Sequence, residues 1–478
     1  MQATALAGLR VLVVGAAREG TAVSAYLARH GACVRLADAR PLDASRQDLA
    51  DLAAAGVQLE GAVAEPRLDG QDLVVLSPGV PPTAPVVQAA RVRGLPLSSE
   101  PRLFVQLFGG PVVGVTGSSG KTTTTSLLGE MLRSAGRRTL VGGNIGLPLI
   151  STLDGEAETA EVAVMELSSF QLELFSPAYQ GPGVAARRSA ASQAVSLAGW
   201  SPAVAVVTNI TPNHLDRHPT MDDYVLAKSQ VLRFQHSGDW AVLNADDPLS
   251  RLLEPLVRGE RLTFSLKGPV AQGAWLQGDA LVLRWDGREQ VACRRGELLL
   301  RGEHNVANVL AACCGAAAAG ASPEAMGAAA RTFAGMPHRL EVVRQVGGVT
   351  WINDSIATSP ERAVAALKAF DEPLVLLAGG RDKHLSWDEW ARCAADRVRA
   401  VVGFGECAGL VEGALSALGE RAPAFRRASD LAAAVAIAQA LVQPGDVVLL
   451  SPGGTSFDAY RDFEERGEAF RQLVRSLS

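Results

Sequence analysis

Residues 112–122 read Val112-Val113-Gly114-Val115-Thr116-Gly117-Ser118-Ser119-Gly120-Lys121-Thr122. The mostly β-branched first half predicts a buried strand, and the segment after Thr122 looks helical. A glycine-rich turn between a strand and a helix presents backbone N–H groups that bind phosphate oxygens. The strict motif has glycine where Val115 stands, so this is a shorter variant. We expect Lys121 to reach the terminal phosphates and Thr122 to hold Mg²⁺; a turn without a ligand is the alternative.

The same order of strand, glycine-bearing turn and helix-like stretch begins again on either side of this segment. The expected strands are residues 11–14, 34–37 and 73–76, then 112–116, 162–165 and 204–208, and finally 349–352, 374–377, 400–402 and 447–450. We therefore predict an α/β fold with three domains. They are an N-terminal Rossmann-like domain (1–109), a central P-loop ATPase-type domain with a mostly parallel sheet (110–337) and a C-terminal Rossmann-like domain (338–478).

The composition is that of a globular protein, with 478 residues, 48% apolar and 20% charged. A net charge of −5 provides no general attraction to nucleic acid or to anionic lipid, so we expect neither as a partner. The six cysteines form no C-x-x-C pair, which favours a reducing cytoplasm over a disulfide framework or zinc site. The apolar residues 306–321 are too few to span a bilayer and predict a buried helix.

The first glycine-bearing turn, Gly15 to Gly20, resembles a dinucleotide-binding fingerprint. Its second glycine is replaced by Ala17, and that glycine lets the backbone approach a pyrophosphate, so NAD binding is disfavoured. Asp38, at the end of the next strand, can contact a ribose or base of another nucleotide. A purely structural role for the turn is the alternative.

The central segment places polar residues after two strands. Glu166 closes the strand that begins at Val162, and His214 follows the strand that ends at Thr208. Ligands gather at the carboxyl ends of parallel strands, so Glu166, His214 and Thr122 are candidates to share a divalent metal. An ion pair for the glutamate and a structural histidine are the alternatives. Lys228, on a helix-like segment, is by its pattern alone a solvated lysine.

Taken together, the motifs resemble those of the Mur ligases, ATP-dependent amide-forming enzymes of peptidoglycan synthesis. The resemblance is strongest to members that add glutamate to UDP-N-acetylmuramoyl-L-alanine, and it covers nearly the whole chain. The strings that carry it are residues 116–124, 142–146, 166–173, 209–217, 302–308, 337–339, 353–355 and 451–467.

The resemblance implies a role for each matching residue. The phosphates of ATP, with Mg²⁺, would be held by Gly117, Ser118, Ser119, Gly120, Lys121, Thr122 and Thr123. The adenosine side would lie at the interface between the central and C-terminal domains and contact Asn305, Asn308, Arg339 and Asp354. The metal ligands would be Thr122, Glu166, His214 and a carbamylated Lys228, with Lys121, Lys228 and His214 catalytic. The UDP-sugar would contact Asp38, Arg40, Ser77, Gly79 and Asn144, and glutamate would contact Lys383, Ser456 and Phe463.

The chain departs from the family pattern in three places. Ile356 stands where many members have a lysine, and Arg18-Glu19 replace the usual uridine-loop residues. Residues 176–202 form an insertion with no assigned role. The resemblance implies a cytoplasmic ligase, which we expect to be a monomer, that uses D-glutamate; the same chemistry with L-glutamate or another amino acid stays open. A nucleotide-regulated binding protein without turnover is the alternative from another class.

Overall fold

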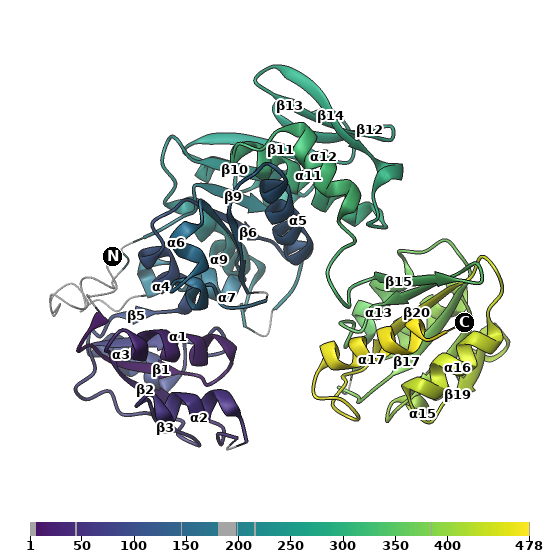
Figure 1. Cartoon of the computed structure of the whole chain (residues 1–478), viewed down its shortest axis with the longest axis horizontal. Coiled ribbons are helices and arrows are strands. Elements are labelled where there is room, and N and C mark those ends of the chain that lie inside the picture. The colour runs from purple at the N-terminus through teal and green to yellow at the C-terminus, as the bar shows by residue number, and fades with distance from the viewer. Residues whose placement is uncertain are drawn as a thin grey trace. The chain divides into compact units, whose positions relative to one another are not determined.

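The computed structural model describes residues 6–43, 45–144, 146–179, 197, 199–214, 217–383 and 385–477. The chain forms two compact units (Figure 1). The first consists of Met1–Leu298 and His304–Arg331, and the second of Leu299–Glu303 and Thr332–Ser478. The backbone therefore passes between the units three times.

The first unit contains a parallel sheet built from the N-terminal segment. Its strands are β1 (Arg10–Val14), β2 (Cys33–Ala37), β3 (Gln58–Glu60), β4 (Leu73–Leu76) and β5 (Leu97–Ser98). They lie in the order β3-β2-β1-β4-β5, and all neighbouring pairs are parallel. The connecting helices are α1 (Arg18–Arg29), α2 (Gln47–Ala54), α3 (Pro85–Val92) and α4 (Glu100–Leu107). Parallel neighbours require such crossover helices, and β4 and the residues of β1 after Arg10 are apolar because both faces are covered.

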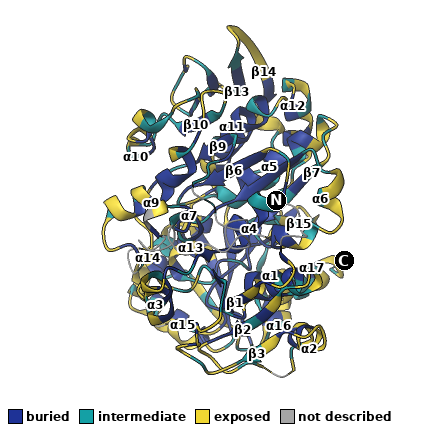
Figure 2. Cartoon of the chain, turned by 90° about the vertical axis from the view of Figure 1, so that its left-hand side faces the viewer, coloured by how far each residue is buried: buried dark blue, intermediate teal, exposed yellow. Residues whose placement is uncertain are grey.

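A second sheet of nine strands completes the first unit. Its strands are β6 (Val112–Thr116), β7 (Thr139–Gly143), β8 (Val162–Glu166), β9 (Val204–Val207), β10 (Trp240–Asn244), β11 (Glu260–Ser265), β12 (Gly273–Gln277), β13 (Ala280–Trp285) and β14 (Arg288–Arg294). The order is β14-β13-β12-β11-β10-β9-β6-β8-β7, parallel from β7 to β12 and antiparallel beyond it. Figure 2 shows β6 and β9 as buried strands, so the loops after them start from a rigid layer.

The helices of this second sheet are α5 (Lys121–Ser134), α6 (Glu156–Thr159), α7 (Ser169–Glu173), α9 (Met221–Arg233), α10 (Pro248–Arg251), α11 (Glu303–Ala318) and α12 (Pro323–Thr332). Helix α11 packs closely on the sheet and on α5. A Cβ on its Gly315 would lie 2.5 Å from Leu128 of α5 and 3.1 Å from Val206 of β9. The predicted buried helix is confirmed.

The second unit contains a six-stranded sheet. Its strands are β15 (Glu341–Val346), β16 (Val349–Asn353), β17 (Leu374–Gly379), β18 (Val398–Phe404), β19 (Ala424–Arg427) and β20 (Val447–Gly453), and its helices are α13 (Pro360–Leu367), α14 (Asp388–Arg397), α15 (Ala408–Ser416), α16 (Leu431–Leu441) and α17 (Phe463–Arg475). The order is β15-β16-β20-β17-β18-β19, with only β15 antiparallel to its neighbour.

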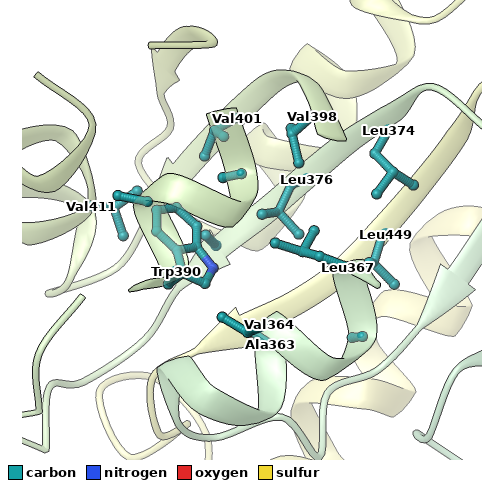
Figure 3. Packing of buried hydrophobic residues seen from close by; sticks show 14 of the residues in the cluster. Ala363, Val364, Leu367, Leu374, Leu376, Trp390, Val398, Val401, Val411 and Leu449 are labelled. Atoms are coloured by element: carbon teal, nitrogen blue, oxygen red, sulfur yellow. The ribbon is translucent and has the colours of Figure 1, made fainter. Parts of the chain in front are cut away.

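Alternate residues of β17 enter two cores on opposite faces of this sheet, as the two-residue repeat of a strand requires. Leu376 packs with Leu449 and Trp390 on one face, shown in Figure 3, whereas Leu377 packs with Phe470 on the other. A strand buried on both faces is apolar at every position, which is why β17 could be predicted as a strand from the sequence.

The predicted α/β class with three mostly parallel sheets is confirmed, although the antiparallel extension β12–β14 was not anticipated. The domain boundaries at 109/110 and 337/338 stay predictions. Of the predicted insertion 176–202, residues 180–196 and 198 lie outside the described residues. No helix among the described residues is long and apolar enough to cross a membrane.

Candidate active site

The phosphate-binding loop lies between β6 and α5, as predicted. Its two glycines have left-handed backbone conformations, with φ of 151° at Gly117 and 77° at Gly120. Both also lie against other residues. A Cβ on Gly117 would be 1.9 Å from Thr208 Oγ1, and one on Gly120 would be 2.1 Å from Asn308 Oδ1. Glycine is therefore required at both positions. The first N–H groups of α5 have no partner within the helix, as at any helix N-terminus, and can bind an anion.

The loop after β9 holds the phosphate-binding loop in shape. Asn209 accepts hydrogen bonds from the N–H of Ser118 through its carbonyl oxygen (2.9 Å) and from the N–H of Ser119 through Oδ1 (3.0 Å). The hydroxyl of Thr208 donates to the Ser119 carbonyl oxygen at 2.6 Å. These bonds fix the loop before any ligand binds.

Two lysines point at the same turn. Lys121 Nζ donates to the carbonyl oxygens of Gly117 and Ser118 at 3.1 and 3.2 Å, and Lys228 Nζ donates to the Gly117 carbonyl oxygen at 2.8 Å. Lys228 is only 1% exposed, so the interpretation of it as a solvated helix lysine is wrong. Burial lowers its pKa well below the usual range, and the charge of Lys121 lowers it further. A neutral amine is the form of a lysine that reacts as a nucleophile.

Glu166, at the end of β8, is 1% exposed. Its Oε1 accepts a hydrogen bond from Asn144 Nδ2 at 2.7 Å, and its carbonyl oxygen accepts one from the Asn144 N–H at 3.0 Å. Its Oε2 is buried without a hydrogen-bond partner in the described part of the chain. A buried carboxylate oxygen in that state fits a cation, because hard cations such as Mg²⁺ prefer oxygen ligands.

His214 has a left-handed backbone conformation with φ of 56°, and its ring lies edge-on to Phe170 of α7 at a centroid distance of 5.0 Å. Among the described residues, no three His, Cys, Asp or Glu side chains form a group that could hold a metal. The predicted set contains only two residues of these types, Glu166 and His214. Its joint role with Thr122 and Lys228 stays a prediction.

The predicted adenosine-side residues of the first unit lie on α11. Asn308 donates through Nδ2 to Asn305 Oδ1 at 3.1 Å, and its own Oδ1 lies against Gly120 of the phosphate-binding loop. Asn305 and Asn308 are one helical turn apart, so both face the same side of α11. The structure thus brings Asn308 to the loop that the sequence predicted to bind phosphate.

The predicted nucleotide residues of the first sheet gather at its carboxyl edge. Asp38 accepts hydrogen bonds from the N–H groups of Ala16 and Arg40 at 2.8 and 2.9 Å. Burial opposes ionisation of Asp38, but these bonds outweigh it and lower its pKa. Ser77 donates to the Gly15 carbonyl oxygen at 3.1 Å, whereas Gly79 is exposed. The side chain of Arg40 is 79% exposed and pairs with Asp38 Oδ1 through Nε at 3.3 Å.

In the second unit, Asp354 follows β16 and is 4% exposed. It accepts hydrogen bonds from Ser451 Oγ at 2.9 Å and from the N–H of Leu340 at 3.2 Å. Burial raises its pKa to about 7 despite these bonds, and the charge of Arg339 acts in the opposite direction. The common role of Asp354 and Arg339 toward a nucleotide stays a prediction.

The predicted glutamate residues lie at three places in the second unit. Lys383 is exposed, with Nζ 3.4 Å from Thr358 Oγ1, and Ser456 is 2% exposed after β20. Phe463 begins α17, and its carbonyl oxygen accepts a hydrogen bond from Ser355 at 2.8 Å. In the described part of the chain no hydrogen bond or ion pair joins Lys383, Ser456 and Phe463 to one another, so their common role stays a prediction.

Two residues that organise the site were not singled out from the sequence. Gln171 caps α7, and the Ser-x-x-Gln spacing from Ser168 could have indicated this. Arg466 is fully buried and donates to the carbonyl oxygens of Gly454, Thr455 and Ser355. Its only sequence signal is a charged residue on the apolar face of an amphipathic helix.

Comparisons with known proteins match each part of the chain. The Mur ligase MurD-like N-terminal domain matches residues 9–99, the Mur ligase middle domain matches 115–186 and 184–316, and the Mur ligase glutamate ligase domain matches 338–454. The UDP-N-acetylmuramoylalanine–D-glutamate ligase of Pelotomaculum thermopropionicum is 42% identical over 98% of both chains. The ligase of the same name from Symbiobacterium thermophilum is 44% identical over 98% of both.

Solved structures support the same fold. The UDP-N-acetylmuramate-alanine ligase MurC of Thermotoga maritima aligns with a TM-score of 0.57 at 18% identity, covering 98% of this chain and 99% of that one. The MurF ligase of the same organism, solved with ADP, aligns with a TM-score of 0.55 at 20% identity over the whole of both chains.

Proposed function

The chain belongs to the Mur ligase family, and we propose that it is an ATP-dependent ligase that joins D-glutamate to UDP-N-acetylmuramoyl-L-alanine during peptidoglycan synthesis. The observation that carries this proposal is the full-length similarity to relatives named for that reaction. The phosphate-binding loop supports it, because an amide-forming ligase must bind ATP and the loop lies in the segment matched by the middle-domain model.

We assign the phosphates of ATP to the loop after β6. Its proposed contacts are the backbone and side chains of Gly117, Ser118, Ser119, Gly120, Lys121, Thr122 and Thr123. Asn305 and Asn308 on α11, and Arg339 and Asp354 in the second unit, are proposed for the nucleoside side. The position of Asn308 against Gly120 supports its part in this assignment.

Mg²⁺ fits the residues present, since Glu166 keeps a buried oxygen with no hydrogen-bond partner among the described residues. We assign its ligands to Thr122, Glu166, His214 and a carbamate on Lys228. Burial of Lys228, which lowers its pKa and favours the neutral amine, supports the carbamate, which would convert that amine into an oxygen ligand. When bound, the ion neutralises charge on the transferring phosphoryl group.

The reaction needs positioning more than a nucleophilic side chain. A carboxylate is a poor electrophile, so the γ-phosphoryl group of ATP first passes to the alanyl carboxylate, forming an acyl phosphate and ADP. In this step Lys121 and the loop N–H groups hold and neutralise the phosphoryl oxygens. The amine of D-glutamate then attacks the acyl carbon, the new C–N bond forms, and phosphate and a proton leave.

The substrate assignments follow the two remaining groups of residues. Asp38, Arg40, Ser77, Gly79 and Asn144 are proposed for the UDP-sugar, and Lys383, Ser456 and Phe463 for glutamate. A two-carboxylate substrate requires a cation, which Lys383 supplies. We also propose that the protein works as a monomer in the cytoplasm on small molecules, without nucleic acid or membrane partners.

The test is a phosphate-release assay with the complete mixture and with single omissions. Phosphate is expected only when ATP, Mg²⁺, UDP-N-acetylmuramoyl-L-alanine and D-glutamate are all present. Release that continues without the muramoyl substrate would refute the ligase assignment, and acceptor-independent binding of ATP with no turnover would favour a binding protein.

A further inference from the structure

Two consecutive residues at the start of α1 reach from the first sheet to the second. Glu19 is 9% exposed and accepts a hydrogen bond through Oε1 from Gln171 Nε2 at 2.7 Å. Arg18 donates from Nη2 to the carbonyl oxygen of Asn144 at 3.3 Å. Asn144, just after β7, donates to Glu166, and Gln171 follows Glu166 in the chain, in helix α7 after β8. The turn after β1 is therefore tied to a residue that contacts this carboxylate and to the helix that follows it.

The amide of Gln171 has little freedom. Its Oε1 accepts from the N–H of Ser168 at 2.9 Å and from the Ser168 hydroxyl at 3.1 Å, and its own N–H donates to that hydroxyl at 3.2 Å. With the amide oxygen fixed in this way, its NH₂ group points to Glu19. Ser168 is only two residues after Glu166, so holding Gln171 also holds the backbone that carries Glu166.

The same turn of α7 is joined to the segment that carries His214. Ser169 forms a hydrogen bond with His218 Nε2 at 3.0 Å, and the His218 N–H donates to the His214 carbonyl oxygen at 2.9 Å. Glu19 thus contacts the first turn of α7, which is linked to the segments that carry Glu166 and His214. Among the described residues, it has no hydrogen bond with either of these proposed ligands.

A second carboxyl group explains why the protonation state of Glu19 matters. Glu100 is 1% exposed and accepts from the N–H of Ile150 at 2.8 Å. Burial first, and then the charge of Glu100, raise the pKa of Glu19 to about 8, while Gln171 and Arg18 oppose this. Each carboxyl group leaves Oε2 buried without a hydrogen-bond partner in the described ranges. Ionising both buried carboxyl groups at once costs free energy, so the neutral form of Glu19 is favoured. A neutral side chain can therefore replace Glu19.

We propose that Glu19 is a positioning residue of the ligase, which sets the metal affinity of the site by holding Gln171 and, through it, the first turn of α7. The inference rests on the proposed function and deepens it. Glu19 stands where the family has a uridine-loop residue, and the proposed role does not require Glu19 to contact a nucleotide. Residues that orient metal ligands commonly change metal affinity by about 10 to 100-fold when they are removed.

The test measures Mn²⁺ binding by electron paramagnetic resonance in the full chain with a non-hydrolysable ATP analogue. Glu19→Ala should weaken Mn²⁺ binding by about tenfold and raise the Mg²⁺ requirement of turnover by a similar factor. Glu19→Gln keeps an acceptor for Gln171 and should stay within about twofold of the wild type. Glu60→Ala, which removes an ion pair with Arg35 inside the first sheet, is the matched control and should bind Mn²⁺ normally.

A swap of donor and acceptor keeps the inference testable if Glu19→Ala does not fold. Gln171→Glu places a carboxylate against Glu19 and should weaken Mn²⁺ binding above pH 8, where Glu19 is also ionised, whereas Glu19→Gln combined with Gln171→Glu should restore it. Normal Mn²⁺ affinity in Glu19→Ala, or no restoration in the double variant, overturns the inference. Because Mn²⁺ binding is measured without either acceptor substrate, a wild type that binds Mn²⁺ but does not turn over defeats the proposed function separately.

Discussion

The hydroxyl of Thr208 occupies the space that a side chain on Gly117 would need, with a distance of 1.9 Å from a Cβ built at Gly117 to Thr208 Oγ1. The same hydroxyl donates to the carbonyl oxygen of Ser119. Thr208 therefore cannot move away without releasing the phosphate-binding loop, so the shape of this loop depends on the strand beside it.

Gly117→Ala should disturb the loop for two reasons, the clash with Thr208 and the φ of 151°. Strain of this kind costs about 1 to 3 kcal/mol, which corresponds to about a 5 to 150-fold loss of ATP affinity if the loop absorbs it. Calorimetric titration with ATP measures the effect. Gly413→Ala, at a helical position with open space around it, should leave ATP affinity unchanged. Equal affinities in all three proteins would contradict the close-packing argument.

Lys121→Ala should reduce turnover by at least about 10²-fold, because it removes the positive charge that we assign beside the phosphoryl group being transferred. Lys368→Ala, which loses an exposed pairing with Glu389, controls for a general effect of removing a lysine. Steady-state phosphate release measures both variants. A near-normal rate in Lys121→Ala would show that the loop does not bind the transferring phosphate in the way proposed.

Lys228 should carry a carbamate when CO₂ is available. Its nitrogen lone pair attacks the carbon of CO₂, a C–N bond forms, and the amine proton leaves. Nuclear magnetic resonance with ¹³C-bicarbonate should show one carbamate signal that is missing in Lys228→Ala. Electron density for a bare amine at Lys228, in crystals grown near neutral pH with nucleotide and Mg²⁺, would count against this modification.

Glu100→Gln should make the protein less sensitive to rising pH. Burial raises the pKa of Glu100 to about 7 from an ordinary 4.5, so the folded state binds this proton more tightly than the unfolded state. Its contribution to stability is fully present below pH 4.5 and is lost as the pH rises toward 7, by no more than about 3 kcal/mol. Thermal unfolding at pH 5 and pH 8 measures the difference. The exposed Glu65→Gln should behave like the wild type, and an unchanged pH dependence in Glu100→Gln would argue against a protonated carboxyl group.

Lys383→Ala should mainly raise the KM for glutamate, because it removes the cation that we assign to a two-carboxylate substrate. We expect an increase of about tenfold or more, in line with the loss of a charge-assisted hydrogen bond. Ile356 stands where the family resemblance implies a lysine, so we expect Lys383 to carry more of the charge recognition here. Rates with D- and L-glutamate, measured side by side, test the stereochemistry; faster turnover of the L form would overturn the D assignment but not the ligase chemistry.

Most of the fold could be predicted because its strands are buried on both faces. Such strands, for example Leu374 to Leu377, are apolar without interruption and are followed by glycine-bearing turns. The antiparallel strands β12–β14 lack this signal, since residues such as Arg288 and Glu289 are exposed on an edge. The sequence marks local periodicity, not which strand joins the edge of a sheet.

Without the family resemblance, the sequence predicts a site residue only where a local motif indicates its role. The glycine-rich loop does so, but Lys228 does not, because nothing near it in the sequence reveals that its helix faces the carbonyl oxygen of Gly117, 111 residues away. Gln171 and Glu19 are separated by 152 residues. Pairings of this kind depend on how the sheets pack, which a periodicity argument cannot supply.

The three passages of the backbone between the units also bear on synthesis by the ribosome. Helix α11 is made after residue 298, yet most of it belongs to the first unit and packs on α5 and β9. At an elongation rate of about 5 to 20 residues per second, the nascent first unit waits for a second or more with this apolar surface uncovered. Exposed apolar surface of this kind favours aggregation and chaperone binding, and the first unit can complete its native fold only after α11 has been made.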